Sequence, residues 1–193
     1  MEILHADKDI IVIVKPVGLD SEHDIPTQLG NVYPVHRLDK NVGGVMVYAK
    51  TKSAAAALSK AIQDGTMVKE YLAQVHGIPP EKGDWSDLLF KDSSKNKVFV
   101  VKKERKGVKK ARLEFTRLKE DEPSLVHIRL HTGRSHQIRV QFASRGFPLV
   151  GDGKYGAKDN VATPMLFSCR LTFPLNGKMQ IFTAEPEWAQ GYL

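Results

Sequence analysis

One carboxylate is a candidate for chemistry because of what stands on either side of it. Asp39 closes the tetrapeptide His-Arg-Leu-Asp at 36–39, and two glycines and the apolar run 45–49 follow. A carboxylate held by a rigid scaffold at the mouth of a strand is a common way to build a reactive site. An aspartate in a turn more often bonds backbone N–H groups or caps a helix. The tetrapeptide alone therefore does not establish a catalytic role for Asp39, and the other motifs of the chain must be considered.

Two further segments are too polar to be scaffold alone. Tyr71 follows Lys69 and Glu70 among apolar strand positions, and Arg139 lies near the start of an amphipathic helix, one residue beyond the apolar Ile138. A part-buried guanidinium needs a carboxylate partner, and a bidentate pair would also orient that carboxylate. The sequence does not establish whether that partner is Asp39.

Strands outnumber helices among the elements that must position these residues. Helices are predicted at 51–63, where Thr51 is the N-cap, and at 135–145. Residues 18–34 are expected to form a loop and 79–87 a connector, and the strands at 98–102 and 111–118 a charged hairpin turning near Gly107. The remaining strands are expected at 9–15, 44–50, 67–75, 125–130, 165–173 and 179–183. This order predicts an α+β fold with one large, mainly antiparallel (mixed) sheet, flanking helices and an active-site cleft.

Length and composition fit one domain over residues 1–193. The chain is 41% hydrophobic and carries a formal net charge of +7, and the excess of positive charge is confined to residues 91–120. It is densest over 102–112, where seven basic residues stand against one acidic residue. Charge focused in this way attracts a polyanion, so nucleic acid is favoured as the partner over a merely solubilising surface.

Several classes of protein fit the sequence poorly. The longest apolar run near the N-terminus is too short to span a membrane, and no charged and apolar leader precedes it. A single cysteine, Cys169, fits a reducing compartment, so we expect a cytoplasmic protein. The spacing of His36, His131, His136 and Asp39 matches no standard ligand motif, so we expect no metal.

Five segments in order carry a family resemblance. They read VKPVGL at 14–19, HRLD at 36–39 with GGVMVYAKT after it, KEYLAQVHG at 69–77, GRSHQIRVQFASRGFPLVGDGKYG at 133–156 and MLFSCRLTF at 165–173. Together they resemble the motifs of the RluA-type pseudouridine synthases. The resemblance extends from about residue 9 to residue 183. It implies an isomerase that detaches a uracil from its ribose, turns it and reattaches it through carbon, without cofactor or metal.

The resemblance also implies roles for single residues. Asp39 would be the essential catalytic aspartate, acting at or beside the anomeric carbon, and Arg139 would pair with it. Tyr71 would stack on the base and is a candidate to help remove the C5 proton, and Leu166 would pack against the uracil. Arg37 is a candidate to enter the space that the flipped nucleotide leaves. Its neighbour His36 is also expected to bind the substrate.

RNA recognition is expected from the catalytic domain itself, since the small N-terminal RNA-binding domain of many relatives does not precede it. The basic stretch from Lys102 to Arg112 would grip phosphates of an rRNA or tRNA stem-loop, and we expect a monomer. Its substrate-binding lysines are Lys102, Lys103, Lys109 and Lys110. The chain departs from the family at Val42-Gly43, where a Thr-Ser pair is usual, which puts the hydrogen bonds of the turn in question.

Two other functions remain open at this stage. One is a catalytically inactive RNA-binding module of the same fold, in which Asp39 only braces a turn. The other is a nuclease or glycosidase, which needs a metal cluster or a second carboxylate. The presence of Asp39, Tyr71 and Arg139 together favours the synthase. The sequence names neither the RNA nor the uridine, and it does not show whether Asp39 attacks C1′ or removes the C2′ proton.

Overall fold

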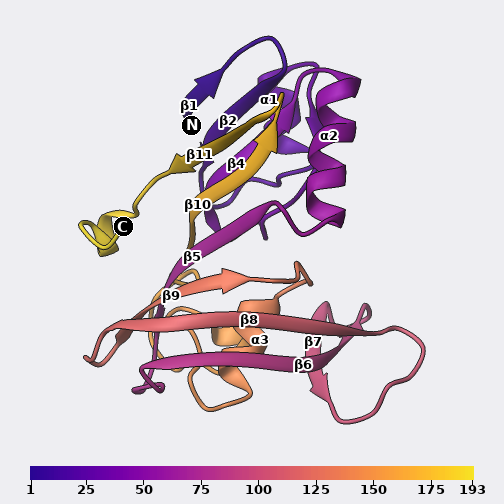
Figure 1. Ribbon diagram of the computed structural model, residues 1–193. Coiled ribbons are helices and arrows are strands. Elements are labelled where there is room, and N and C mark those ends of the chain that lie inside the picture. The colour runs from indigo at the N-terminus through magenta and orange to yellow at the C-terminus, as the bar shows by residue number, and fades with distance from the viewer. The chain divides into compact units, whose positions relative to one another are not determined.

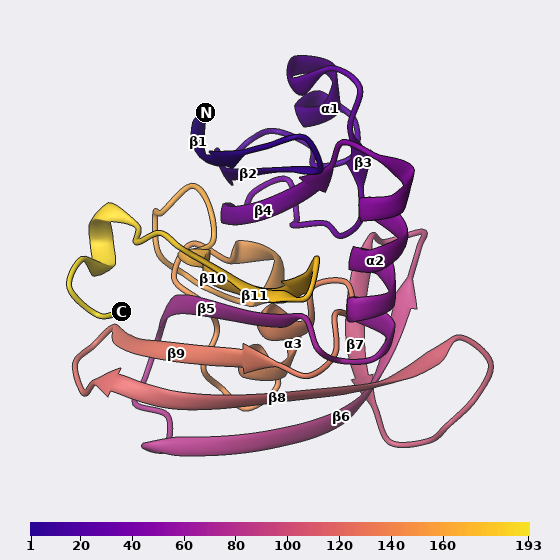
Figure 2. The ribbon, with the colours of Figure 1, turned by 45° about the horizontal axis from the view of Figure 1, so that its top comes forward.

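The computed structural model describes residues 1–193, which divide into two compact units. Unit 1 comprises Met1–Tyr71 and Phe167–Leu193, and unit 2 comprises Leu72–Leu166. Strand β5 (Val68–Val75) leads the chain from unit 1 into unit 2, and β10 (Leu166–Leu175) leads it back. Figures 1 and 2 show the ribbon from two directions. That both units form one catalytic domain stays a prediction.

Unit 1 is built on antiparallel strands with one parallel pair. Its strands follow the order β1-β2-β4-β10, with β11 paired to β10 and β3 to β4. The β4–β10 pair is parallel and the others are antiparallel. The elements are β1 (Glu2–Ala6), β2 (Ile10–Lys15), α1 (Asp24–Leu29), β3 (Tyr33–Pro34), β4 (Gly43–Ala49), α2 (Lys52–Gln63), β11 (Lys178–Thr183) and the 3-10 turn η2 (Glu187–Ala189), together with β10.

The core of unit 1 lies between α2 and the central strands. Strand β4 is buried along its whole length, as expected for a continuous apolar run in a sheet that is covered on both faces. Helix α2 begins where Thr51 accepts a hydrogen bond from the Ala54 N–H (3.1 Å), which confirms the predicted cap. Leu58 of α2 is fully buried against residues of β2, β4 and β10, and Figure 1 shows the helix alongside these strands.

Unit 2 is an antiparallel sheet with one helix packed on it. The strand order is β9-β8-β6-β7. Helix α3 places Phe142 against Trp85 of β6 and Phe115 of β8, with ring centroids 4.7 and 5.2 Å apart. Edge-on aromatic contacts of this kind fix how a helix is seated on a sheet. The elements are β6 (Lys82–Asp92), β7 (Lys97–Val101), β8 (Val108–Lys119), β9 (Ser124–Leu130), α3 (Gln137–Ala143) and the 3-10 turn η1 (Gly153–Tyr155).

The predicted charged hairpin and the predicted connector before it are both wrong. Residues 79–87 do not form a connector, because β6 begins at Lys82 and pairs with both β7 and β8. Leu88 of β6 lies opposite Val101 on one side and Lys110 on the other. Strands β7 and β8 are therefore not paired with each other, and the connection 102–107 crosses β6. Adjacency along the chain favoured a hairpin, but the longer ladder that β6 offers each strand decides the pairing.

The predicted fold class is confirmed, since the chain has a large, mainly antiparallel mixed sheet with few helices. Strand β1, the short helix α1 and the two-residue β3 were not predicted, and the last two replace part of the expected loop at 18–34. The expected cleft stays a prediction. No helix is long and apolar enough to cross a membrane.

Candidate active site

The turn that carries Asp39 is held by its backbone on both sides. The Val42 N–H donates to the Asp39 carbonyl (2.9 Å), and the Gly18 N–H donates to the Lys40 carbonyl (2.8 Å). Ahead of it, the buried Ser21 hydroxyl donates to the Leu38 carbonyl (2.6 Å) and accepts from the Leu38 N–H (3.1 Å). The Asp39 side chain is half-buried, in the turn that precedes β4. A scaffold this closely bonded can hold a carboxylate in one place.

A buried lysine, Lys15, lies beneath this turn and was not identified from the sequence. Its Nζ donates to the carbonyls of Pro16 (2.9 Å), Leu19 (2.8 Å) and Lys40 (3.3 Å). Burial lowers the pKa of Lys15 to about 8, although the charges of Asp20 and Asp39 act in the opposite direction. Lys15 therefore ties the segment 16–19 to the turn and places a buried cation near Asp39. The signal was present in VKPVGL, where a lysine ends an otherwise apolar strand.

Tyr71 and Asp39 lie close enough in unit 1 to interact electrostatically. Its ring is 6% exposed. Burial raises the pKa of the Tyr71 hydroxyl, Asp39 raises it further, and a hydrogen bond with Ser168 opposes both effects. The phenol thus keeps its proton at neutral pH. A neutral phenol is a poor base, so this environment suits stacking on a base better than removal of a proton.

His36 has a clear structural contact. Its Nε2 accepts the Val47 N–H (3.2 Å), which leaves the other ring nitrogen to carry the proton of the neutral ring. That nitrogen, Nδ1, is buried without a hydrogen-bond partner. Burial lowers the pKa of His36 well below its ordinary value, and the nearby charge of Lys69 adds to the effect. His36 is therefore a neutral ring that satisfies a donor of β4, and contact with substrate stays a prediction.

Arg37 and Leu166 differ sharply in exposure. The Arg37 guanidinium is exposed and donates to the Glu22 carboxylate (2.6 Å), so a surface ion pair holds it. Leu166 is 7% exposed and begins β10, directly before the residues that pair with the glycines of β4. The exposed arginine could move towards an RNA at little cost, because surface ion pairs are weak. Contacts of both residues with a uridine stay predictions.

Arg139 has a buried carboxylate partner that the sequence did not identify. Its Nε and Nη2 donate to the two oxygens of Asp152, each at 2.7 Å. Arg139 is 7% exposed and Asp152 1% exposed, so the pair is well shielded from water. Bidentate pairs of this kind fix the plane of a guanidinium. The expected pairing of Arg139 with Asp39 would join the two units and stays a prediction.

A tyrosine reinforces this pair. The Tyr155 ring lies 5.1 Å from the Arg139 guanidinium, and its hydroxyl accepts the Val98 N–H (2.9 Å). The same hydroxyl contacts Nδ1 of His136 (2.8 Å). His136 is itself in the left-handed region (φ 50°), a costly conformation that often marks a functional segment.

Residues of three motifs thus meet in unit 1, and residues from both ends of the motif at 133–156 meet in unit 2. Unit 1 brings Asp39, Tyr71 and Lys15 into electrostatic contact. Unit 2 brings Arg139, Asp152, Tyr155 and His136 together. Asp152 and Tyr155 were not among the candidate residues from the sequence. Their presence at the end of the segment 133–156 is the signal that could have found them.

The basic stretch lies on the surface of unit 2. Lys102, Lys103, Lys109 and Lys110 are all exposed, the first two on the crossing connection and the others on β8. Figures 1 and 2 show this connection looping out beyond the strands. Next to it is an open hollow of about 460 Å³ that is lined by Leu88, Glu104, Arg105, Val108 and Lys110.

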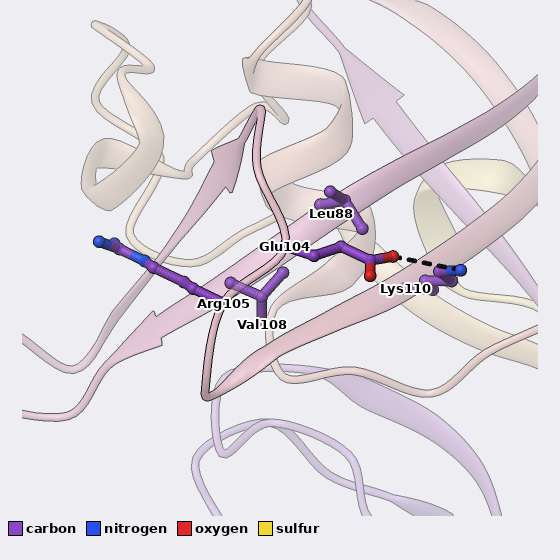
Figure 3. A pocket seen from close by; sticks show the side chains of 5 residues that line it. All are labelled: Leu88, Glu104, Arg105, Val108 and Lys110. Carbon is purple, nitrogen blue, oxygen red and sulfur yellow. Dashed lines mark ion pairs between the residues drawn. The ribbon is translucent and has the colours of Figure 1, made fainter.

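The hollow is lined by charged and apolar residues. Glu104 and Lys110 form an ion pair across it (3.2 Å), as Figure 3 shows, while Arg105 points away from them. The Arg105 guanidinium lies 4.6 Å from the centre of the Phe90 ring. Guanidinium planes and lysines beside apolar floors are typical of surfaces that bind RNA.

No group of three or more His, Cys, Asp or Glu side chains could hold a metal ion. Cys169 is fully buried, and burial raises the pKa of its thiol to about 12, so it behaves as a small apolar side chain.

Comparison with known proteins gives one consistent family. Residues 9–144 match the family model described as RNA pseudouridylate synthase. The chain is 33% identical to an RNA pseudouridine synthase of Aquifex aeolicus, over 96% of this chain and 69% of the relative. It is 31% identical to the dual-specificity RNA pseudouridine synthase RluA of Yersinia pestis, over 97% of this chain and 100% of the relative. It spans only 54% of the ribosomal large subunit pseudouridine synthase C of Buchnera aphidicola, at 31% identity.

Solved structures agree on the fold. The human RNA pseudouridylate synthase domain containing 1 superposes with a TM-score of 0.84 at 22% identity, over 97% of this chain and 84% of that one. The human RNA pseudouridylate synthase domain containing 4 superposes with a TM-score of 0.78 at 24% identity, over 97% and 89%.

The fold and the matched segments define a pseudouridine synthase, an RNA-modifying isomerase. The chain belongs to the RNA pseudouridylate synthase family, and its relatives place it among the RluA-type members.

Proposed function

We propose that this chain isomerises specific uridines of ribosomal or transfer RNA to pseudouridine, with Asp39 as the catalytic aspartate. It would act as a cytoplasmic monomer without metal or cofactor. The observation that carries the proposal is the closeness of Asp39 to Tyr71 in unit 1, where the carboxylate raises the pKa of a buried phenol. A carboxylate beside an aromatic face is what a reaction on an extruded nucleobase needs.

The chemistry follows from these two groups. Breaking the glycosidic bond builds positive charge on the ribose, which the Asp39 carboxylate can stabilise or trap. A base must first leave its stack, at a cost of a few kcal/mol, and the Tyr71 ring can recover part of that cost. The detached uracil stays in the site, turns and bonds through C5, whose proton must then leave.

The second group of residues would support the first. Arg139, oriented by Asp152, would pair with the Asp39 carboxylate and align it. Leu166 would pack against the uracil, and Arg37 would fill the space that the flipped nucleotide leaves. His36 would tie the turn to β4 through its bond to the Val47 N–H.

RNA is the substrate that the basic surface supports. The exposed lysines at 102, 103, 109 and 110 lie together on unit 2 and would bind phosphates of a stem-loop. Two relatives are named as ribosomal large subunit pseudouridine synthases, which makes ribosomal RNA the first substrate to test.

Mapping pseudouridine in cellular RNA with and without the gene tests this function. We expect one or a few uridines to lose their pseudouridine signal in the deletion strain and to regain it with the wild-type gene. The Asp39→Asn gene should fail to restore it. If the chain binds RNA but no site changes, it is the inactive RNA-binding module that the sequence left open.

A further inference from the structure

His76, at the end of β5, lies between two carboxylates that come from distant parts of unit 2. Its Nε2 is 2.6 Å from Oδ2 of Asp159, and its Nδ1 is 3.0 Å from Oε1 of Glu122. Both ring nitrogens face acceptors, so the ring is held best when it is protonated and both nitrogens donate. Glu122 also accepts the Gly77 N–H (2.5 Å), which holds that carboxylate in place.

The Asp159 carboxylate also accepts hydrogen bonds from backbone N–H groups, one of them directly beside Asp152. Its carboxylate accepts the Gly151 N–H (2.9 Å) and the Val161 N–H (2.9 Å). Gly151 is in the left-handed region (φ 78°), and an added Cβ would lie 2.1 Å from the Thr163 carbonyl oxygen, so the segment has little room to adjust. The next residue along is Asp152, whose two oxygens bind Arg139.

The rest of this segment is anchored to β5, from which His76 extends. The His76 N–H donates to the Pro148 carbonyl (2.9 Å), and the Val150 N–H donates to the Gln74 carbonyl (3.0 Å). Residues 148–150 are thus tied to β5 by backbone bonds, and the Asp152 N–H donates to the Leu149 carbonyl (3.1 Å), while the Asp159 carboxylate holds Gly151 and Val161. Only the second set of bonds includes a group that titrates near neutral pH.

We propose that His76 is a positioning residue whose protonated ring, held between Glu122 and Asp159, keeps Asp152 in place to orient Arg139. Loss of its proton would loosen residues 151–161 and, with them, the guanidinium plane. This inference rests on the proposed function, in which Arg139 supports the reaction. It adds a residue to which the resemblance assigns no role, and it makes the rate of isomerisation depend on pH through an ion pair in unit 2.

The direction of the pH effect follows from the contacts. The hydrogen bonds with Asp159, and then that with Glu122, raise the pKa of His76 above its ordinary value near 6.5. The contact is therefore complete below that value and is lost as pH rises through the higher value of the folded protein. The pKa of Asp159 is lowered to about 2, first by the Gly151 N–H and then by His76, so Asp159 stays charged throughout.

The test compares variants that change the charge of His76 in opposite ways. Single-turnover rates are measured on saturating substrate RNA from pH 6 to pH 9. The wild-type rate should fall by roughly three- to tenfold through the titration of His76, the scale of one part-exposed charged hydrogen bond. His76→Gln should be slow at all pH values without that step. His76→Arg, which stays charged, should keep the fast rate to high pH.

Two further variants keep the test sharp. Asp159→Asn should move the step to lower pH, because it removes the charge that holds the proton. His5→Gln is the matched control, since His5 is also a part-exposed histidine beside an aspartate (Asp7, 3.1 Å), and it should leave the profile unchanged. A His76→Gln profile that matches wild type, or a His76→Arg enzyme as slow as His76→Gln, overturns the proposal.

A second measurement does not need activity. Hydrogen exchange of the peptide that covers residues 151–161 should be faster in His76→Gln than in wild type at pH 6.5, while that of α2 stays the same. If this exchange differs but no RNA is modified, the ion pair stands and the proposed function fails. If RNA is modified but neither exchange nor rate responds to His76, the function stands and the positioning role fails.

Discussion

Asp39 and Arg139 illustrate how much a single functional residue depends on the groups that hold it. Asp39 sits in a turn whose backbone bonds go to Val42 and whose neighbour Lys40 is bound by Lys15. Arg139 is fixed by Asp152 in a pair that excludes water. Neither supporting residue was among the candidates from the sequence.

We expect Asp39→Asn to abolish pseudouridine formation while RNA binding and the fold are kept. The amide has the size of the carboxylate but cannot stabilise a positive ribose. Single-turnover assays measure the rate, and filter binding measures the affinity. Asp64→Asn is the control, because Asp64 is an exposed aspartate paired with Lys60 on α2. Residual activity within about tenfold of wild type, or about 1.4 kcal/mol of barrier, would contradict the role.

Arg139→Lys should lose most activity, because lysine cannot reproduce two parallel hydrogen bonds to Asp152. Arg112→Lys is a matched control. Arg112 makes the same two-pronged contact with Asp84 (2.9 and 2.8 Å), but that pair is about half exposed. The control should change the free energy of unfolding by less than about 1 kcal/mol and leave turnover at saturating RNA intact, since lysine keeps the positive charge of this residue of the basic stretch. Equal turnover of the two variants would mean that the buried pair has no part in catalysis.

At the scale of elements, β4 and β10 approach each other closely in unit 1. Gly44 lies opposite Ser168 in the parallel pair, so the motif with Asp39 and the late motif are joined through backbone. There is no room there for a side chain. An added Cβ on Gly44 would lie 2.3 Å from the Ser168 carbonyl oxygen.

Gly44→Ala should therefore destabilise the protein by at least about 2 kcal/mol, since it combines an unfavourable φ of 124° with a backbone clash. Urea unfolding measures the loss. Gly65→Ala separates the two causes, because Gly65 also has a positive φ (71°) but no atom within 4 Å of its added Cβ. That control should lose only about 1 kcal/mol. A Gly44→Ala loss no larger than the control would show that β10 can move away.

The crossing connection and β8 carry the candidate RNA contacts, although not as the hairpin that the sequence predicted. Replacing Lys102, Lys103, Lys109 and Lys110 with Ser should weaken binding to matched and mismatched RNAs alike. The slope of log K against log salt should become shallower by about 0.7–0.9 for each phosphate that the variant no longer neutralises. Turnover at saturating RNA should change little.

A second quadruple variant removes the same charge elsewhere. It replaces four exposed lysines of unit 1, namely Lys8, Lys52, Lys60 and Lys178, with Ser. The salt slope of this control should stay near that of wild type. If both quadruple variants change the slope equally, net charge and not the basic stretch governs binding.

At the scale of the whole molecule, the buried Lys15 and the half-buried Lys69 tie stability to pH. Burial lowers the pKa of Lys15 and of Lys69 to about 8 each. The unfolded chain keeps both protons up to about pH 10.5, so between pH 8 and pH 10 it binds more protons than the folded chain. Stability contributed by these groups therefore rises with pH in that window.

The two lysines should respond differently to substitution by methionine. Lys15 bonds three carbonyls, so Lys15→Met leaves buried acceptors unpaired and should destabilise the protein at pH 7. Burial alone lowers the pKa of Lys69, so Lys69→Met should stabilise the protein at pH 7 and flatten the rise above pH 8. Urea unfolding at pH 7, 8 and 9 measures both. A Lys69→Met variant that is less stable than wild type at pH 7 would contradict the account.

The sequence by itself determined what local rules encode. Apolar runs, the Thr51 cap and the ordered motifs predicted β2, β4, α2, β10 and the α+β class, and the family was recognisable from the same residues. These features depend on neighbours within a few residues. For the same reason Asp39 and Tyr71 could be singled out from their sequence motifs alone.

Only the tertiary structure decided which distant groups meet. In the tertiary structure, β6 lies between β7 and β8, and the Arg139 guanidinium binds the Asp152 carboxylate. Lys15 lies beneath the Asp39 turn. Strand partners and buried charges are chosen by the closure of long loops and by competition between many possible contacts. Periodicity and spacing along the chain do not record that competition.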